Sequence, residues 1–263
     1  MKASHFTRTF LVPAVLASLL LSAPFASAQS GEVLHMYGPG GPAPAMQEAA
    51  EAFGKANDIK IEVVAGPTGK WLEKAKADAD LIYSGAEYQM TDLSRAMPDQ
   101  IDPTTAVPLY LRPASILVRP GNPKKINGFS DLLKPGMKIM VVSGAGQTGL
   151  WEDVAGRKGN IGTVRAFRKN IAVDATNSVE AKKIWIEKKE IDAWLIWNIW
   201  QVSNPELAAL VPVEKSYAIY RDTAIAVTKQ GNDKELSSKF VAFLQSPEGA
   251  QIFKKWGWLT SQK

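Results

Sequence analysis

Short apolar stretches alternate with turns and amphipathic segments along the chain after residue 30. Residues 33–36, 60–65 and 80–83 are apolar or alternate between apolar and polar side chains, which predicts three β-strands. A helical pattern follows each of them, at residues 45–53, at 70–77 and after Ser84, whose hydroxyl is the expected cap of the third helix. The chain therefore begins with three strand–turn–helix units.

The same alternation continues through the second half of the chain. It predicts strands at residues 138–142, 171–173 and 192–197, and helices at 161–170, 178–189, 234–244 and 247–256. Strands that alternate with helices favour a parallel sheet, with ligands bound at the carboxyl ends of the strands.

Two long extended segments interrupt this pattern, at residues 108–120 and 218–227. We expect both to cross between two lobes. The first lobe then comprises residues 29–111 plus 222–263, and the second comprises residues 112–221. The predicted fold class is α/β, in two lobes, with the ligand in the cleft between them.

The turn after the first strand has the sequence Tyr-Gly-Pro-Gly-Gly-Pro-Ala-Pro, residues 37–44. Its glycines allow a sharp turn and a close approach of the backbone to a ligand. A helix that starts here directs unpaired N–H groups and the positive end of its dipole to one spot, which favours an anion. A plain strand-to-helix turn is the alternative, but the pattern recurs at residues 66–69, 84–85 and 143–149.

These turns define the predicted ligand-binding set. Glycine amides and turn hydroxyls would surround an oxyanion, with nearby cations as countercharges and one tryptophan lining the cleft. The set is Gly40, Gly41, Thr68, Gly69, Lys70, Ser84, Gly85, Ser143, Gly144, Gly146, Thr148, Gly149, Trp197 and Arg221. Alternatively, each cation is a surface charge or a hinge ion pair, and Trp197 is a core residue. Arg112, in the other crossing segment, is either a hinge residue or a ligand contact.

The first 28 residues have the pattern of a cleaved signal peptide. Lys2 and Arg8 precede an apolar run at residues 10–21, and Ala-Ser-Ala at 26–28 is the expected cleavage site. The mature protein is therefore predicted to be periplasmic. The chain has no cysteine, which excludes disulfides and thiolate metal sites.

Charge and residue types narrow the function classes. Without Lys2 and Arg8, 29 basic and 26 acidic residues remain, a net charge of +3 that is not clustered as nucleic-acid binding requires. His35 is the one histidine after the signal, and there is no Gly-x-Ser-x-Gly elbow and no P-loop. We therefore expect a binding protein rather than an enzyme, with no cofactor, no metal and no nucleic-acid partner.

Several segments resemble a known family. They are residues 34–42, 66–71, 144–146 with 149–153, 192–194 and 253–258, and they span nearly all of the chain after the signal. On these segments the chain resembles type 2 periplasmic solute-binding proteins of the accessory colonization factor and major antigenic surface protein group, which is related to sulfate and molybdate binders. The resemblance implies a two-lobe type II periplasmic-binding-protein fold, an anionic ligand, and dimerisation.

Three functions stay open at this point. The first is capture of a small anion for the membrane subunits of an ABC-type importer: a sulfate-like or molybdate-like oxyanion, or a phosphorylated or polycarboxylate metabolite. The second is a surface adhesin or colonisation factor on the same scaffold. The third is a hydrolase that uses carboxylates alone. The first fits the turns best.

Overall fold

A computed structural model describes Met1 and residues 31–260, apart from the side chain of Ala145. The predicted signal peptide, residues 1–28, falls outside the described residues except for Met1, so it stays a prediction. Residues 31–260 belong to one compact unit. In that part of the chain no helix is both long enough and apolar enough to cross a membrane.

Strands and helices alternate as the sequence predicts. The strands are β1 (Val33–Gly38), β2 (Lys60–Ala65), β3 (Leu81–Tyr83), β4 (Val107–Val118), β5 (Ile139–Val142), β6 (Ile171–Ala175), β7 (Ala193–Trp197), β8 (Ala209–Pro212) and β9 (Tyr220–Val227). The α-helices are α1 (Ala43–Asn57), α2 (Leu72–Asp78), α3 (Glu87–Ala96), α4 (Leu150–Gly156), α5 (Ile161–Lys169), α6 (Ser178–Glu187), α7 (Ile199–Val202), α8 (Glu235–Leu244) and α9 (Pro247–Lys255). This confirms the predicted α/β class.

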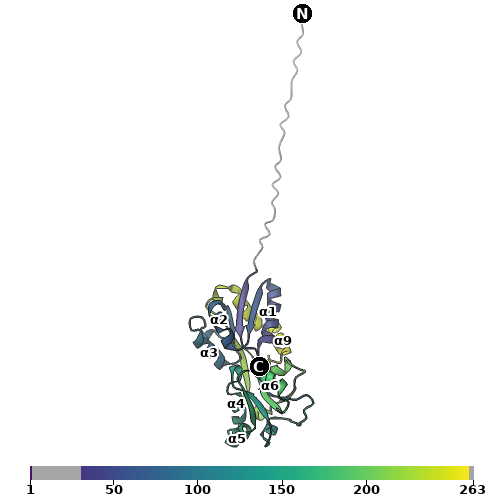
Figure 1. Cartoon of the computed structure of the whole chain (residues 1–263). Helices are drawn as coiled ribbons and strands as arrows, with labels where there is room; N and C mark the ends of the chain where they lie inside the picture. Colours follow the sequence, from purple (N-terminus) through teal and green to yellow (C-terminus); the bar gives the residue numbers. More distant parts are fainter. Residues whose placement is uncertain (2–30, 261–263) are drawn as a thin grey trace. The chain divides into compact units, whose positions relative to one another are not determined.

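The strands form a sheet with the order β2-β1-β3-β9-β4-β7-β5-β6, and β8 pairs with β4. β1 is parallel to β2 and β3, and β5 is parallel to β6 and β7. The antiparallel strands β9 and β4 join these two parallel groups. Figure 1 shows α1, α2, α3 and α9 around the first group and α4, α5 and α6 around the second.

β4 takes part in both halves of the sheet. Its residues 107–113 pair with β9, whereas residues 114–118 pair with β7 and β8. Arg112 and Arg221 face each other across the β4–β9 pair. The predicted lobe boundaries lie at these two residues, although the division of the chain into lobes stays a prediction.

Two helix starts differ from the sequence expectation. A 3-10 turn at Thr68–Lys70 precedes α2, so the helix begins at Leu72 rather than at Lys70. The indole of Trp71 is buried, and its N–H donates to the carbonyl of Gly66, which holds this turn. The cap of α3 is Ala86 and not Ser84, because the Ser84 side chain is buried against β9.

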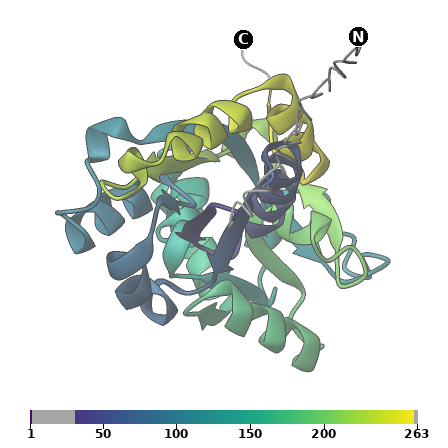
Figure 2. The same ribbon diagram turned by 90° about the horizontal axis from the view of Figure 1, so that it is seen from above.

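Helices from the two ends of the chain pack together over the first half of the sheet. α8 and α9 contact α1 (Figure 2). Phe53 of α1 meets Phe240 of α8 with ring centroids 5.3 Å apart. Ser246 caps α9 and Pro247 occupies its first turn, as the sequence predicts.

A fully buried carboxylate ties these helices to the sheet. Asp80, just before β3, accepts hydrogen bonds from the His35 backbone N–H and from the Lys234 ammonium, both at 2.8 Å. Lys234 caps α8, so this carboxylate connects β1, β3 and α8. A buried carboxylate is stable only when it is paired in this way.

Asp80→Asn should therefore lower the free energy of unfolding by about 2–4 kcal/mol, because Lys234 loses its counter-ion in a largely buried setting. Urea unfolding at neutral pH measures this. The matched control Asp99→Asn removes an exposed carboxylate and should change stability by about 0.5 kcal/mol or less. Equal stabilities of the two variants would contradict a structural role for Asp80.

Candidate functional site

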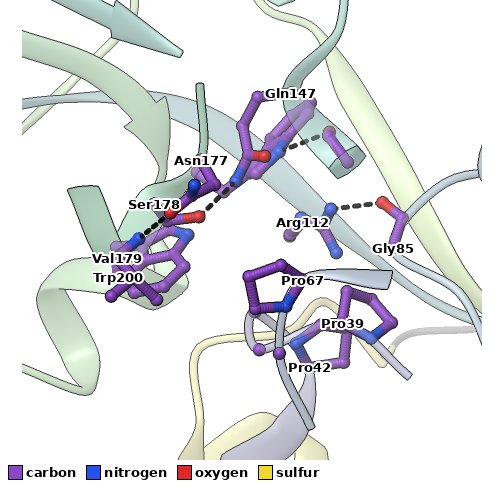
Figure 3. Close-up of a pocket in the computed structure, with 15 residues that line it drawn as sticks. Pro39, Pro42, Pro67, Gly85, Arg112, Gln147, Asn177, Ser178, Val179 and Trp200 are labelled. Carbon is purple, nitrogen blue, oxygen red and sulfur yellow. Dashed lines mark hydrogen bonds between the residues drawn. The ribbon is translucent and has the colours of Figure 1, made fainter. Parts of the chain in front are cut away.

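A cavity opens where five turns meet. Residues 39–42, 66–67, 85, 146–147 and 177–179 line it, together with Arg112, Trp197 and Trp200 (Figure 3). The centre of a water-sized sphere can move through a volume of about 40 Å³ inside this cavity. That space holds roughly three waters, or one small anion in their place. We call this space the Arg112 cavity.

The topology explains why these turns meet. Each of the five follows the carboxyl end of a strand: β1, β2, β3, β5 or β6. β1 runs parallel to β2 and β3, and β5 runs parallel to β6, so the carboxyl ends gather within each group. Binding at the carboxyl ends of parallel strands is the general rule for open α/β sheets.

Arg112 reaches the cavity from β4 and is 1% exposed. Its guanidinium carbon lies 4.8 Å from the ring centroid of Trp197 and 4.8 Å from that of Trp258, so it makes a cation–π contact with each ring. One terminal nitrogen donates to the carbonyl of Gly85, and the other donates to the carbonyl of Asp222 at 3.5 Å. Its Nε has no partner in the described structure.

Arg112 keeps its charge in this setting. Burial lowers the pKa of Arg112 to about 9. The charge of Asp222 opposes this lowering and the charge of Arg221 adds to it. At neutral pH the side chain is therefore a buried cation, and the hydrogen bonds found for it in residues 31–260 go to backbone carbonyls.

The turn that leads into α1 lines the same cavity. Gly40, Gly41 and the N-cap residue Pro42 belong to its wall, and the prolines at 42 and 44 have no N–H group to donate. The first amides of a helix have no partner inside the helix, and the helix dipole places partial positive charge there. α1 and Arg112 thus both favour negative charge in the cavity.

Polar side chains from the second half of the sheet form another wall. Gln147 is 5% exposed, and its amide nitrogen donates to the Ser178 hydroxyl at 3.2 Å (Figure 3). Asn177 caps α6 by accepting from the N–H groups of Val179 and Glu180, at 3.0 Å each. The oxygen of the Gln147 amide has no partner in the described structure.

Five of the sequence-predicted ligand residues line this cavity. They are Gly40, Gly41, Gly85, Gly146 and Trp197. Trp197 is fully buried and donates its indole N–H to the carbonyl of Gly146 at 2.9 Å. It is therefore both a core residue and a cavity wall.

The residues predicted at the second turn lie beside the cavity rather than in its wall. Thr68, Gly69 and Lys70 form the 3-10 turn that follows Pro67, and the last two are exposed. Thr68 lines a separate hollow together with Thr148.

The remaining turn residues make contacts within the protein. Ser84 is buried, and its carbonyl accepts from the Thr223 hydroxyl. The Ser143 hydroxyl donates to Asp174. Gly144 packs so tightly that an added Cβ would lie 2.0 Å from the carbonyl oxygen of Thr176, and Gly149 adopts a φ of 71° at the start of α4.

Arg221 also lies outside the cavity wall. Its guanidinium donates to the carbonyl of Thr148 at 2.8 Å and to the carboxylate of Asp153, and it stacks 5.3 Å from the Tyr88 ring centroid. These contacts connect β9 to the loop before α4, so the described structure shows Arg221 as a bridge between the two halves of the sheet.

The sequence analysis missed one group of cavity residues, and it left the role of Arg112 undecided. The group left out comprises Pro39, Pro42, Gly66, Pro67, Gln147, Asn177, Ser178, Val179 and Trp200. A signal for part of it was present, because Asn177 with Glu180 three residues later, just after a predicted strand, is a typical helix start. For Arg112 the alternative of hinge or ligand contact was left open, and its side chain lines the cavity.

A pair of carboxyl groups lies in a hollow separate from the Arg112 cavity. Glu87, the first residue of α3, shares a hydrogen bond with Asp222, which raises the pKa of Glu87 to about 7. Partial burial and the charge of Asp222 act in the same direction. Both residues line an open hollow that also contains Arg221 and Tyr88.

The sequence of this chain matches a family model described as "Bacterial extracellular solute-binding protein" over residues 34–259. This chain belongs to that family. The match includes each of the five turns that line the Arg112 cavity.

Solved structures and curated relatives agree with this assignment. L-Phospholactate-bound PEB3 of Campylobacter jejuni is 35% identical with a TM-score of 0.81, over 86% of this chain and 98% of PEB3. The sulfate-binding protein of Escherichia coli strain K12 is 24% identical over 181 residues, 61% of this chain and 53% of that protein. The chain thus spans about half the length of the curated relatives it matches.

The periplasmic molybdate-binding protein of Azotobacter vinelandii is 14% identical with a TM-score of 0.66, over 87% of this chain and all of that one. At this identity the likeness concerns the fold alone. Together with PEB3 it confirms the predicted periplasmic-binding-protein fold for this solute-binding family member.

The carboxyl pair predicts a pH-dependent stability. Native Glu87 holds its proton to about pH 7, whereas an ordinary glutamate loses it near 4.5, so the folded state binds more protons between these values. Stability should therefore fall as the pH rises through this window. Glu87→Gln keeps a donor to Asp222 and cannot ionise, so its melting temperature should rise relative to wild type from about pH 5 to about pH 8.

Melting temperatures across this range measure the effect. Asp92→Asn, on an exposed position of the same helix, is the control and should keep the wild-type dependence. A constant difference between Glu87→Gln and wild type at all pH values would show that the pair shares no proton.

Proposed function

We propose that this protein binds a small anion in the Arg112 cavity and delivers it to an ABC-type importer in the periplasm. One observation carries the proposal: a fully buried guanidinium lines the cavity with its Nε unpartnered. A cation removed from water costs several kcal/mol unless a charge or hydrogen-bond acceptors compensate it. An anion in the cavity would supply both.

The surroundings of Arg112 support binding of an anion in preference to a cation or an apolar solute. Gly40 and Gly41, which have backbone N–H groups, line the same space, and the positive end of the α1 dipole begins directly after Pro42 in its wall. No carboxylate belongs to the described lining of the cavity. Hydrogen bonds to a charged partner contribute about 1.5–3 kcal/mol each, so a few of them support micromolar affinity.

The relatives suggest the same class of ligand. PEB3 binds L-phospholactate, and the curated relatives are sulfate-binding proteins. These ligands share a compact negative charge carried by oxygen atoms. We therefore propose a sulfate-like or molybdate-like oxyanion, or a phosphorylated or polycarboxylate metabolite, as the solute.

The residue types at the cavity favour capture over catalysis. The described lining contains no histidine, no cysteine and no carboxylate, and its one hydroxyl, on Ser178, accepts a hydrogen bond from Gln147 and has no general base beside it in that lining. Solute binding followed by transfer to the membrane subunits of an importer is consistent with the family. The periplasmic location rests on the predicted signal peptide, and dimerisation rests on the resemblance alone.

Removal of the Arg112 charge tests the proposal. A thermal-shift screen of wild type with sulfate, molybdate, phosphate, citrate and phosphoglycerate should find a stabilising anion. At a concentration a hundred times its dissociation constant, that anion should raise the free energy of unfolding by about 2.7 kcal/mol. Calorimetry should then show at least about tenfold weaker binding of that anion to Arg112→Met, because charged hydrogen bonds are lost.

Two further variants keep this test decisive. Arg95→Met removes an exposed arginine and should bind like wild type. Arg112→Lys keeps the charge between the two tryptophans and should bind with intermediate affinity, which separates loss of binding from loss of folding. Wild-type affinity in a folded Arg112→Met variant, or no response of wild type to any anion, would refute the proposal.

A further inference from the structure

The carbonyl end of the Gln147 side chain is the unusual group in the Arg112 cavity. Gln147 is 5% exposed, and its Oε1 has no hydrogen-bond partner among the described residues. The other end of the amide is occupied, since Nε2 donates to Ser178 Oγ at 3.2 Å. Figure 3 shows this bond on the opposite side of the cavity from Gly85.

Two residues that line the cavity therefore carry buried, unpartnered groups of opposite polarity. Arg112 Nε is a donor, and Gln147 Oε1 is an acceptor. A buried polar group left without a partner loses its hydration and gains nothing in return. A ligand that satisfies both groups must offer an acceptor to Arg112 and a donor to Gln147.

The loop that carries Gln147 is held in place from several sides. The carbonyl of Gly146 accepts the Trp197 indole N–H at 2.9 Å. A Cβ at position 146 would lie 2.9 Å from the Gly85 carbonyl oxygen and 3.0 Å from Arg112, so only glycine fits. Ser178, which receives the Gln147 amide, begins α6 directly after its Asn177 cap. The amide is thus positioned in advance.

We propose that Gln147 selects anions that also carry a hydrogen-bond donor and discriminates against fully deprotonated oxyanions. This inference rests on the proposed function and names the class of solute. A fully deprotonated oxyanion has acceptor oxygens only, so one of them would face the Gln147 carbonyl without a hydrogen between them. A site built to bond a donor rejects the analogue that lacks it.

The class includes hydrogen phosphate and hydroxylated phosphate esters. At neutral pH hydrogen phosphate keeps a proton, whereas sulfate and molybdate have none. The ligand named for the curated relatives, sulfate, would then be a poor solute here. Leaving the Gln147 acceptor without a donor should cost roughly tenfold to a hundredfold in affinity.

Two matched ligand pairs test the selection, by calorimetry slightly above neutral pH. Hydrogen phosphate and sulfate share a shape and differ in one proton. Glycerol phosphate and propyl phosphate are both phosphate esters, and only the first has hydroxyl groups. Binding of this pair rather than of the inorganic ions would show that the preferred solute is an ester. We expect wild type to bind one of these pairs. Within that pair, the ligand with the hydrogen-bond donor should bind at least about tenfold more tightly than the ligand without it.

Two variants should reduce the ratio of affinities between the two ligands of that pair by about tenfold or more. Gln147→Met replaces the amide by an apolar side chain of similar length. Ser178→Ala removes the partner of Nε2 and lets the amide turn. The control Gln245→Met changes an exposed glutamine beyond the end of α8 and should leave the ratio unchanged.

The outcomes separate this inference from the proposed function. The inference would be overturned if sulfate bound as tightly as hydrogen phosphate, or propyl phosphate as tightly as glycerol phosphate. The amide nitrogen of Gln147, and not its oxygen, would then face the cavity. Anion binding as such would be unaffected by this result. A donor preference that Gln147→Met does not change would also overturn the inference. If none of the four ligands binds to wild type and Arg112→Met behaves like wild type toward all anions, the proposed function and the inference both fail.

Discussion

The buried guanidinium of Arg112 is the interaction on which the rest of the site depends. Four separate parts of the chain meet around it: β4 carries it, the turn before α3 supplies the Gly85 carbonyl, and the rings of Trp197 and Trp258 contact it. Burying a cation costs free energy unless dipoles and rings replace water. Here two carbonyls and two rings do so, and Nε is left without a partner among the described residues, on a side chain that lines the cavity.

The pairing of β4 with β9 places a second constraint on the same charge. It brings Arg112 directly opposite Arg221, and like charges in such a pair repel. The structure directs the Arg221 charge away, to the carboxylate of Asp153 and the carbonyl of Thr148. One arginine of the pair thus joins the two halves of the sheet, and the other lines the cavity.

The sequence was sufficient for the features that depend on local chain chemistry. Gly40, Gly85 and Gly146 were found because a glycine turn after a strand must lie at the carboxyl edge of the sheet. Hydroxyls were harder to place, since a serine in a turn has several possible partners: Ser84 turns to β9 and Ser143 to Asp174. The position of Arg112 depends on which strands pair with β4, and no local pattern specifies that pairing.

The two walls of the cavity contribute different things to recognition. The positive end of the α1 dipole and the charge of Arg112 both favour any anion, whatever its shape. The identity of the anion cannot come from such groups, because every oxyanion accepts hydrogen bonds. It must come from side chains that reject some anions, and Gln147 is the buried group with the acceptor chemistry for this. On this proposal a shared fold can serve relatives with different solutes, since positive charge attracts any anion and a few side chains discriminate among anions.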